Sequence, residues 1–277
     1  MAGILYLVAT PIGNLEDITL RALNILKSVD LIAAEDTRHT LGLLNHFEIS
    51  KPLISYYKQT EKSKSEVLIH KLLEGKNIAL VSDAGTPGIS DPGEEIVKQA
   101  IQNNIKVVPV PGACAFINAV IASGMPTNEI EFIGFLSANK KERKDKLEEV
   151  KYDSRTLIFY EAPHKLKVTL ETMLEVFGDR KIVLARELTK IHEEYIRGNL
   201  STILEQKVDI RGEFVIIIEG NCVSKKELET NNLNKKTLEE HYAFYEAQGL
   251  DKKEIIKKIA KDRNTNKNEI YQYFLYS

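Results

Sequence analysis

The chain has 277 residues, of which 43% are hydrophobic and 28% are charged. This balance excludes a disordered or fibrous chain, and the length suits two domains. The formal net charge of −2 excludes nucleic-acid binding through overall positive charge, so any basic face must be local. Two cysteines, Cys114 and Cys222, are too few for a disulfide framework or a cysteine-rich zinc site, and they fit a reducing compartment.

The first residues are apolar, but this stretch is short. No basic segment precedes it, and Pro11 and Gly13 interrupt it, so a buried strand is favoured over a signal peptide. No apolar run approaches the length that a membrane span needs. We therefore expect a soluble, cytoplasmic protein without a membrane partner.

The first part of the chain alternates short apolar runs with helical patterns. One predicted helix carries an apolar stripe from Ile18 to Val29, and another spans residues 65–73. Strands alternating with helices predict a mostly parallel sheet with helices on both faces. The predicted strands are residues 4–9, 31–34, 53–57, 78–81 and 107–110.

A further helix is predicted to open at Asp91-Pro92-Gly93-Glu94. Asp91 is the expected N-cap, Pro92 suits the first helical position, and Glu94 completes a capping box.

A second α/β block follows the Pro111-Gly112 turn, with a charged helix or solvated arm at 138–151. The tail predicts short helices, and its last two flank an Asn-Thr-Asn turn, as in a helix-turn-helix. Such a tail can bind nucleic acid or be a simple packing module. Strands are predicted at 157–160, 182–185 and 214–218, and helices near 164–176, 200–207, 238–247, 251–262 and 267–275. The predicted domains are an N-terminal α/β lobe (1–112), a C-terminal α/β lobe (113–220), a polar linker (221–236) and a small helical domain (237–277).

The turns after the predicted strands are the first place to look for a site, because ligands bind at the carboxyl ends of parallel strands. Gly and Pro there are often only turn chemistry. The loop at 82–93 is different, since it holds three Gly, two Pro and two Asp in twelve residues. A connection this long and rich in glycine lets the backbone approach a ligand closely.

Several other kinds of site are excluded or left open by the motifs. The chain has no G-x-G-x-x-G after the first strand and no P-loop. The six histidines show no metal-ligand spacing, so we expect no metal. The segment from Arg186 to Lys190 is either a solvated salt-bridge cluster or a working site.

Six motifs in order then carry a family resemblance: VATPIGNLEDIT, AEDTRHT, SDAGTPGISDPG, PVPGACA, FYEAPHKL and ARELTKIHEE. Together they closely resemble the ribosomal RNA small-subunit methyltransferase I family of the tetrapyrrole methylase superfamily. The resemblance runs from about residue 5 to residue 220, and the tail resembles the family's small C-terminal helical domain.

The resemblance implies a two-lobed, class III methyltransferase fold that is α/β with a small C-terminal helical domain. It implies a homodimer that binds S-adenosylmethionine between the lobes. The implied reaction is 2′-O-methylation of the ribose of a cytidine in the decoding region of 16S rRNA within the small ribosomal subunit. Carried over by motif, the cofactor contacts are Pro11, Asp83, Gly85, Thr86, Ile89, Cys114, Ala115 and Tyr160, with the region around Leu188 and Gly212 as a further possibility.

A ribose hydroxyl is a weak nucleophile, so a base or a cation near the acceptor oxygen would help the reaction. Glu35 and Glu187 are the candidate bases. Arg38, Arg186 and Lys190 are candidates for holding RNA phosphate or the acceptor oxygen. The alternatives are that the proton leaves to water without a dedicated base, and that Arg186 and Glu187 form only a structural ion pair.

Two rival functions remain open at this point. One is a methyltransferase of the same fold that acts on a tetrapyrrole, and the SDAGTPGISDPG loop and the extra helical tail disfavour it. The other is a non-catalytic RNA-binding or assembly factor that keeps a cofactor pocket. The glycine-rich loop and Asp83 favour a working pocket over this reading.

Overall fold

The computed structural model describes residues 1–206, 211–221, 230 and 233–276. The chain forms two compact units. The first comprises Met1–Glu148 and Arg155–Glu219, and the second comprises Glu149–Ser154 and Gly220–Ser277. Most of the predicted linker, at 222–229 and 231–232, lies outside the described residues, as does Cys222. None of the helices in the described ranges is long and apolar enough to cross a membrane.

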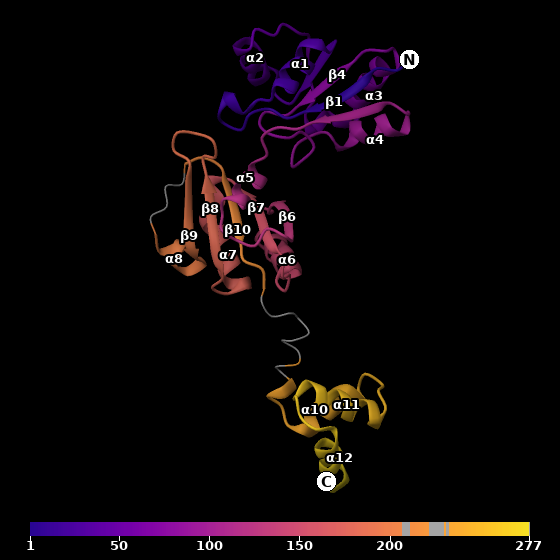
Figure 1. Ribbon diagram of the computed structural model, residues 1–277, viewed down its shortest axis with the longest axis vertical. Coiled ribbons are helices and arrows are strands. Elements are labelled where there is room, and N and C mark those ends of the chain that lie inside the picture. Colours follow the sequence, from indigo (N-terminus) through magenta and orange to yellow (C-terminus); the bar gives the residue numbers. More distant parts are fainter. Residues whose placement is uncertain (207–210, 222–229, 231–232, 277) are drawn as a thin grey trace. The chain divides into compact units, whose positions relative to one another are not determined.

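The first unit begins with a parallel sheet whose strand order is β3-β2-β4-β1-β5. Helices α1 and α2 lie on one side of it and α3 and α4 on the other, as Figure 1 shows. This is the predicted arrangement of helices on both faces of a parallel sheet. The strands are β1 (Ile4–Val8), β2 (Leu31–Ala34), β3 (Leu53–Ser55), β4 (Ile78–Val81) and β5 (Lys106–Val110); the helices are α1 (Leu20–Ser28), α2 (Thr37–His46), α3 (Glu61–Leu73) and α4 (Glu94–Gln102), with short 3-10 turns η1 (Leu15–Asp17) and η2 (Lys58–Thr60).

The two faces of this sheet bury two separate clusters, because successive side chains of a strand point to opposite faces. Ala33 packs with α3 and α4 through Leu68 and Ile96, whereas Ile32 packs with α1 and α2 through Leu26 and Leu44. Because both faces of the sheet are buried, the sequences of its strands are continuous apolar runs and do not alternate between apolar and polar residues.

The start of α4 differs from the prediction. The helix begins at Glu94, and its N-cap is Gly93 (φ +155°). Glycine has no side chain that could accept a hydrogen bond from the first amides of the helix. Instead, Oε1 of Glu61 on α3 accepts the N–H groups of Gly93 (2.8 Å) and Glu95 (3.3 Å). The predicted Asp91 cap and capping box are therefore wrong, because a carboxylate from a neighbouring helix satisfies the free amides.

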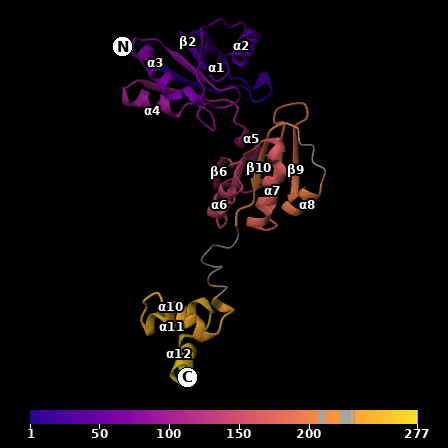
Figure 2. The same cartoon turned by 180° about the vertical axis from the view of Figure 1, so that it is seen from behind.

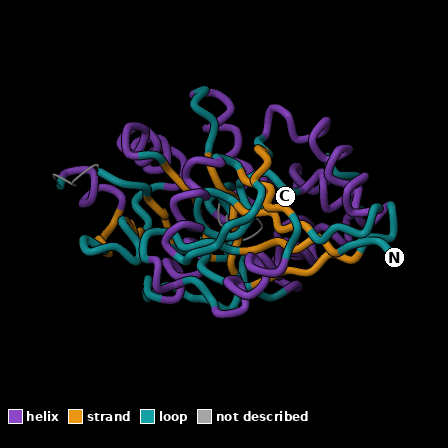
Figure 3. The backbone as a smooth tube through the Cα atoms, turned by 90° about the horizontal axis from the view of Figure 1, so that it is seen from above, coloured by secondary structure: helices purple, strands orange, loops and turns teal. Residues whose placement is uncertain are grey.

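The second sheet of the first unit is mixed, with strand order β6-β7-β10-β8-β9. The pair β6–β7 is parallel and the other pairs are antiparallel. The edge strands β6 and β9 were not predicted, because they are only partly buried and lack a continuous apolar run. The strands are β6 (Ile130–Phe135), β7 (Thr156–Glu161), β8 (Lys181–Arg186), β9 (Glu194–Asn199) and β10 (Phe214–Ile218); the helices are α5 (Ala115–Ile121), α6 (Lys140–Val150), α7 (Pro163–Phe177) and α8 (Leu200–Glu205). Figure 3 shows strands and helices by colour.

The second unit contains α10 (Leu238–Glu246), α11 (Lys252–Asp262) and α12 (Lys267–Tyr276), which Figure 2 shows from behind. Ile255, Ile256 and Ile259 of α11 lie at the centre of its own apolar core. The three helices match the predicted ones to within one residue at every end.

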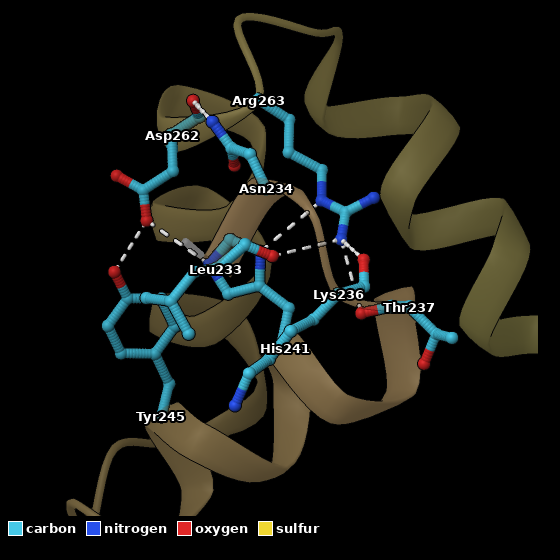
Figure 4. A network of polar contacts seen from close by, with 8 residues as sticks. All are labelled: Leu233, Asn234, Lys236, Thr237, His241, Tyr245, Asp262 and Arg263. Atoms are coloured by element: carbon cyan, nitrogen blue, oxygen red, sulfur yellow. Dashed lines mark hydrogen bonds and ion pairs between the residues drawn. The ribbon is translucent and has the colours of Figure 1, made fainter. Parts of the chain in front are cut away.

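A polar network joins α10 to the end of α11 and to residues 233–237 (Figure 4). The Arg263 guanidinium donates to the carbonyls of Lys236 (2.5 Å) and Thr237 (3.1 Å) and, through Nε, to Nδ1 of the fully buried His241 (3.3 Å). The hydroxyl of Tyr245 donates to the Asp262 carboxylate at 2.5 Å. Desolvation lowers the pKa of His241, which favours its neutral form in this network.

Candidate functional site

The carboxyl ends of β1, β2 and β4 are tied together by hydrogen bonds. Thr10 and Gly85 exchange backbone bonds of 2.8 and 3.1 Å. Oδ1 of Asp83 accepts the N–H of Asp36 at 2.9 Å, which joins the end of β4 to the end of β2. The turns that follow these three strands therefore meet at one edge of the sheet.

The loop at 82–93 is held in a conformation that depends on glycine. Gly85 (φ +81°) and Gly88 (φ +85°) adopt the left-handed region, and Ser90 adopts it without being glycine (φ +64°). The Ser82 hydroxyl makes 3.3 Å hydrogen bonds to the carbonyls of Ala84 and Gly85. Strain at a non-glycine residue persists where surrounding structure enforces it, and such residues cluster at functional sites.

A cavity of about 310 Å³ opens beside this loop. Its wall combines residues that follow strands of the first sheet with residues of the second sheet. Its volume and its mix of apolar and convergent polar groups are typical of a small-molecule site. The lining residues are Ile12, Glu35, Asp83, Ala84, Gly85, Thr86, Ile89, Ser90, Asp91, Cys114, Ala115, Phe135, Tyr160, Glu161, Glu187, Leu188, Lys190, Glu213, Phe214 and Val215.

Several carboxylates in this wall influence one another. Burial, followed by the charges of Glu35, Asp83 and Glu213, raises the pKa of Asp91 to about 7. Burial and then the charge of Asp83 raise the pKa of Glu35. A cation that enters the cavity would relieve this repulsion, so the electrostatics favour a positively charged ligand.

Tyr160 on β7 lines the part of the cavity wall that the second sheet provides, and it contacts two phenylalanines there. Its hydroxyl accepts the N–H of Phe116 at 3.2 Å, and its ring lies 5.4 Å from that of Phe135. Burial raises the pKa of the tyrosine, so the phenol stays neutral. Burial also raises the pKa of the Cys114 thiol. Both groups therefore offer neutral hydrogen-bonding atoms to a ligand.

The turn after β8 is the second strained segment of the wall. Glu187 (φ +51°) and Thr189 (φ +66°) are in the left-handed region. Nζ of Lys190 pairs with Oε1 of Glu187 at 2.9 Å. A Cβ atom at Gly212 would lie 2.0 Å from Oε1 of Glu187, and one at Gly13 would lie 2.6 Å from Cγ of Lys190. Both glycines therefore make room for this ion pair.

The structure brings most of the predicted site residues to the cavity wall. Three of them do not line it. Arg38 is exposed and pairs with Asp36 at 2.8 Å, and this hydrogen bonding lowers the pKa of Asp36 to about 2. Arg186 pairs with Glu194 on the adjacent strand at 2.6 Å, and Pro11 is buried beside the lining residue Ile12. The predicted residues that line the cavity are Glu35, Asp83, Gly85, Thr86, Ile89, Cys114, Ala115, Tyr160, Glu187 and Lys190.

Sequence reasoning missed Asp91, Phe135 and Glu213 as lining residues. Asp91 was assigned to a helix cap, although its place in the unusual loop was a usable signal. Phe135 and Glu213 had no local signal, since one ends an unpredicted strand and the other precedes β10. Among the described residues, no three His, Cys, Asp or Glu side chains are arranged to hold a metal ion.

With this geometry in hand, comparison with known proteins identifies the family. Residues 4–204 match the family described as Tetrapyrrole (Corrin/Porphyrin) Methylases. A solved structure of uroporphyrin-III C-methyltransferase from Thermus thermophilus, complexed with S-adenosylhomocysteine, superposes with a TM-score of 0.56 at 20% identity and covers 78% of this chain and 97% of that one. The chain therefore belongs to the tetrapyrrole methylase family, and its predicted two-lobed α/β fold with a C-terminal helical region is confirmed.

Within that family, two similar proteins carry the same name. The ribosomal RNA small subunit methyltransferase I of Halalkalibacterium halodurans is 50% identical over 276 residues, which cover 98% of this chain and 94% of that protein. The protein of the same name from Bacillus subtilis is 50% identical over 274 residues, with the same coverage. The predicted family resemblance is thus confirmed.

Proposed function

We propose that this protein transfers a methyl group from S-adenosylmethionine to the 2′-hydroxyl of a cytidine ribose in the decoding region of 16S rRNA. The observation that carries the substrate class is the 50% identity, over nearly the whole chain, to relatives named as small-subunit ribosomal RNA methyltransferases. The finer assignment to a cytidine ribose rests on the motif resemblance.

The cavity fits the cofactor by its charge and its shape. S-adenosylmethionine supplies an electrophilic methyl group on a positively charged sulfur. The carboxylates at Glu35, Asp83 and Asp91 complement that charge, while Ile12, Ile89 and other apolar side chains suit the adenine ring. We assign cofactor binding to Asp83, Gly85, Thr86, Ile89, Cys114, Ala115 and Tyr160, with Pro11 supporting the turn behind Ile12.

The wall also offers groups that can handle the acceptor hydroxyl. Glu35, Asp91 and Glu187 are the carboxylates available to accept its proton, and a pKa of about 7 suits Asp91 to general-base work near neutral pH. Lys190 can stabilise a developing negative charge on the acceptor oxygen. Arg38, which is exposed outside the cavity wall, is assigned to an RNA phosphate contact instead, whereas Arg186, which is paired with Glu194, is assigned to a structural ion pair.

The test is transfer of label from radioactive S-adenosylmethionine to small ribosomal subunits that lack the modification. Asp83→Asn is the informative variant, because an amide oxygen still accepts the Asp36 N–H while the charge is lost. We expect the label on a ribose, with transfer lowered at least tenfold in Asp83→Asn and further in Asp83→Ala.

Thr40→Ser is a matched control, because it keeps the hydroxyl and lies on α2, away from the cavity wall. Label on a base, or no label while calorimetry still detects cofactor binding, would refute the substrate assignment and redirect the search to tetrapyrroles. Absence of cofactor binding would refute the assignment of the cavity.

We further propose that the acceptor is the assembled subunit rather than bare RNA, and that the protein acts as a homodimer. The net charge of −2 supports the first point, because local phosphate contacts on such a chain give weak, salt-sensitive RNA binding, and turnover then depends on further contacts in the assembled particle. The second point rests on the motif resemblance. Equal turnover on protein-free RNA would contradict the first proposal, and a monomer in sedimentation equilibrium would contradict the second.

A further inference from the structure

The second unit segregates its charges between two helices. From Thr237 to Ser277 the chain has seven basic and seven acidic residues, so this segment is neutral as a whole. Helix α10 nevertheless carries three glutamates and no Lys or Arg, whereas α11 carries five lysines. Packing of the apolar core does not require this separation, because every one of these lysines is exposed.

Lys253, Lys257 and Lys261 form what we call the lysine stripe of α11. They are four residues apart, so they lie along one side of the helix and recur about every 6 Å. None of the three side chains makes an ion pair or hydrogen bond among the residues that the structure describes. Lys258 is different, since its Nζ lies over the Tyr245 ring, 4.8 Å from the centroid.

In the described part of the chain, neither acidic residue of α11 forms an ion pair with this stripe. Asp262 is turned inward, where it accepts the Tyr245 hydroxyl and lies 3.4 Å from Nε2 of His241. Glu254 is the other carboxylate of the helix and is exposed. The network in Figure 4 bonds Asp262 and Arg263, at the C-terminal end of α11, to Tyr245 and His241 of α10, so the helix that carries the stripe is held in place.

Helix α12 adds a second observation. Its exposed positions include Asn268, Tyr271 and Gln272, and Tyr271 is 47% exposed. Amide side chains can hydrogen-bond to base edges, and an exposed tyrosine ring can stack on an unpaired base. Glu269, the acidic residue of α12, is engaged by the Thr265 hydroxyl at 2.5 Å.

We infer that α11 and α12 form an RNA-docking surface, in which the lysine stripe contacts successive phosphates and the polar face of α12 contacts exposed bases. A charged stripe that neutralises phosphates releases counterions and so gives salt-dependent binding. The inference rests on the proposed function for the identity of the RNA, which is that of the small ribosomal subunit.

The test measures binding of a fluorescein-labelled RNA stem-loop from the decoding region over a range of salt concentrations. The triple variant Lys253→Gln, Lys257→Gln, Lys261→Gln removes the stripe without touching the core. Removal of three phosphate contacts should make the negative slope of log K against log salt shallower by about 2 to 3. It should also weaken binding at low salt at least tenfold. The matched control is Lys27→Gln, Lys62→Gln, Lys98→Gln, which removes three exposed lysines from α1, α3 and α4 and should leave the slope unchanged.

Affinity for S-adenosylhomocysteine, measured by calorimetry, should be equal in the two triple variants, because neither changes the cavity wall. Equal salt slopes for the wild type and the stripe variant would overturn the inference. So would absence of RNA binding by the wild type, or a loss that is seen with intact subunits but not with RNA, which would indicate a ribosomal protein as the partner. RNA binding that depends on the stripe, without methyl transfer to subunits, would support the surface while refuting the proposed reaction.

Discussion

Asp91 illustrates how one side chain changes its role when its surroundings are known. By sequence it is a helix cap, but in the structure it is a half-buried carboxyl with a pKa of about 7, beside Glu35 and Asp83. In the unfolded chain this group ionises near pH 4. The folded protein therefore binds an extra proton between about pH 4 and pH 7, and the stability that this proton confers is lost as the pH rises through 7.

We therefore predict that Asp91→Asn stabilises the ligand-free protein at pH 8 and has little effect near pH 4.5. The expected gain is on the order of 1–2 kcal/mol after allowance for solvent screening. Thermal or urea unfolding at the two pH values measures it. Asp17→Asn, at an exposed position of η1, is the control. A gain of equal size at both pH values would contradict the prediction.

The same carboxylate should also influence ligand choice. S-adenosylmethionine carries a sulfonium charge that S-adenosylhomocysteine lacks, so an ionised Asp91 favours the former. If the proposed function is right, the preference for S-adenosylmethionine over S-adenosylhomocysteine, measured as the ratio of their dissociation constants at pH 8, should fall about three- to tenfold in Asp91→Asn. Calorimetry with both ligands measures the ratio. An unchanged ratio would show that Asp91 does not face the sulfonium.

At the scale of the element, the cap of α4 depends on a residue of another helix. Oε1 of Glu61 accepts two amides at the start of α4 and also the Tyr56 hydroxyl at 3.2 Å. Loss of this carboxylate leaves those donors without their partner, at the end of the loop that forms the cavity wall.

We predict that Glu61→Ala lowers the free energy of unfolding by about 1–2 kcal/mol. Glu61→Gln keeps an acceptor oxygen, so it should lower the free energy of unfolding by less than half as much as Glu61→Ala does. Urea unfolding followed by circular dichroism compares the two variants with the wild type. Equal losses would indicate that charge rather than hydrogen-bond acceptance is what α4 requires, which would refute the capping argument.

The two edge strands show where local pattern is insufficient. The β9 strand reads EYIRGN, which has no apolar run, yet it pairs with β8 along its whole length. Edge strands are half-solvated, so their composition carries little of the strand signal that buried strands show. The central strands β7, β8 and β10, whose residues are mostly buried, were located to within two residues of their observed ends.

At the scale of the whole molecule, the cavity and the helical tail belong to different compact units. Every residue of the cavity wall lies in the unit formed by Met1–Glu148 and Arg155–Glu219. A ligand stabilises only the unit that it contacts, by an amount that grows with its concentration relative to its dissociation constant.

We therefore predict two calorimetric unfolding transitions. S-adenosylhomocysteine should raise the midpoint temperature of only the transition that belongs to the first unit. At a concentration one hundred times the dissociation constant, the stabilisation should be about 2.7 kcal/mol. Ile259→Ala, in the core of the second unit, should lower the midpoint temperature of the other transition and so identify it. A single transition that shifts as one with ligand would show that the units unfold together.

The sequence by itself determined the parallel first sheet, the three helices of the tail, the family and the loops from which the site is built. It did so because these features depend on local periodicity, turn chemistry and runs of neighbouring residues. Only the tertiary structure decided that Asp91 faces Glu35 and Asp83, that Arg186 pairs with Glu194, and that Glu61 rather than Asp91 caps α4. These outcomes depend on contacts between residues far apart in the chain, whose distances and burial no local pattern contains.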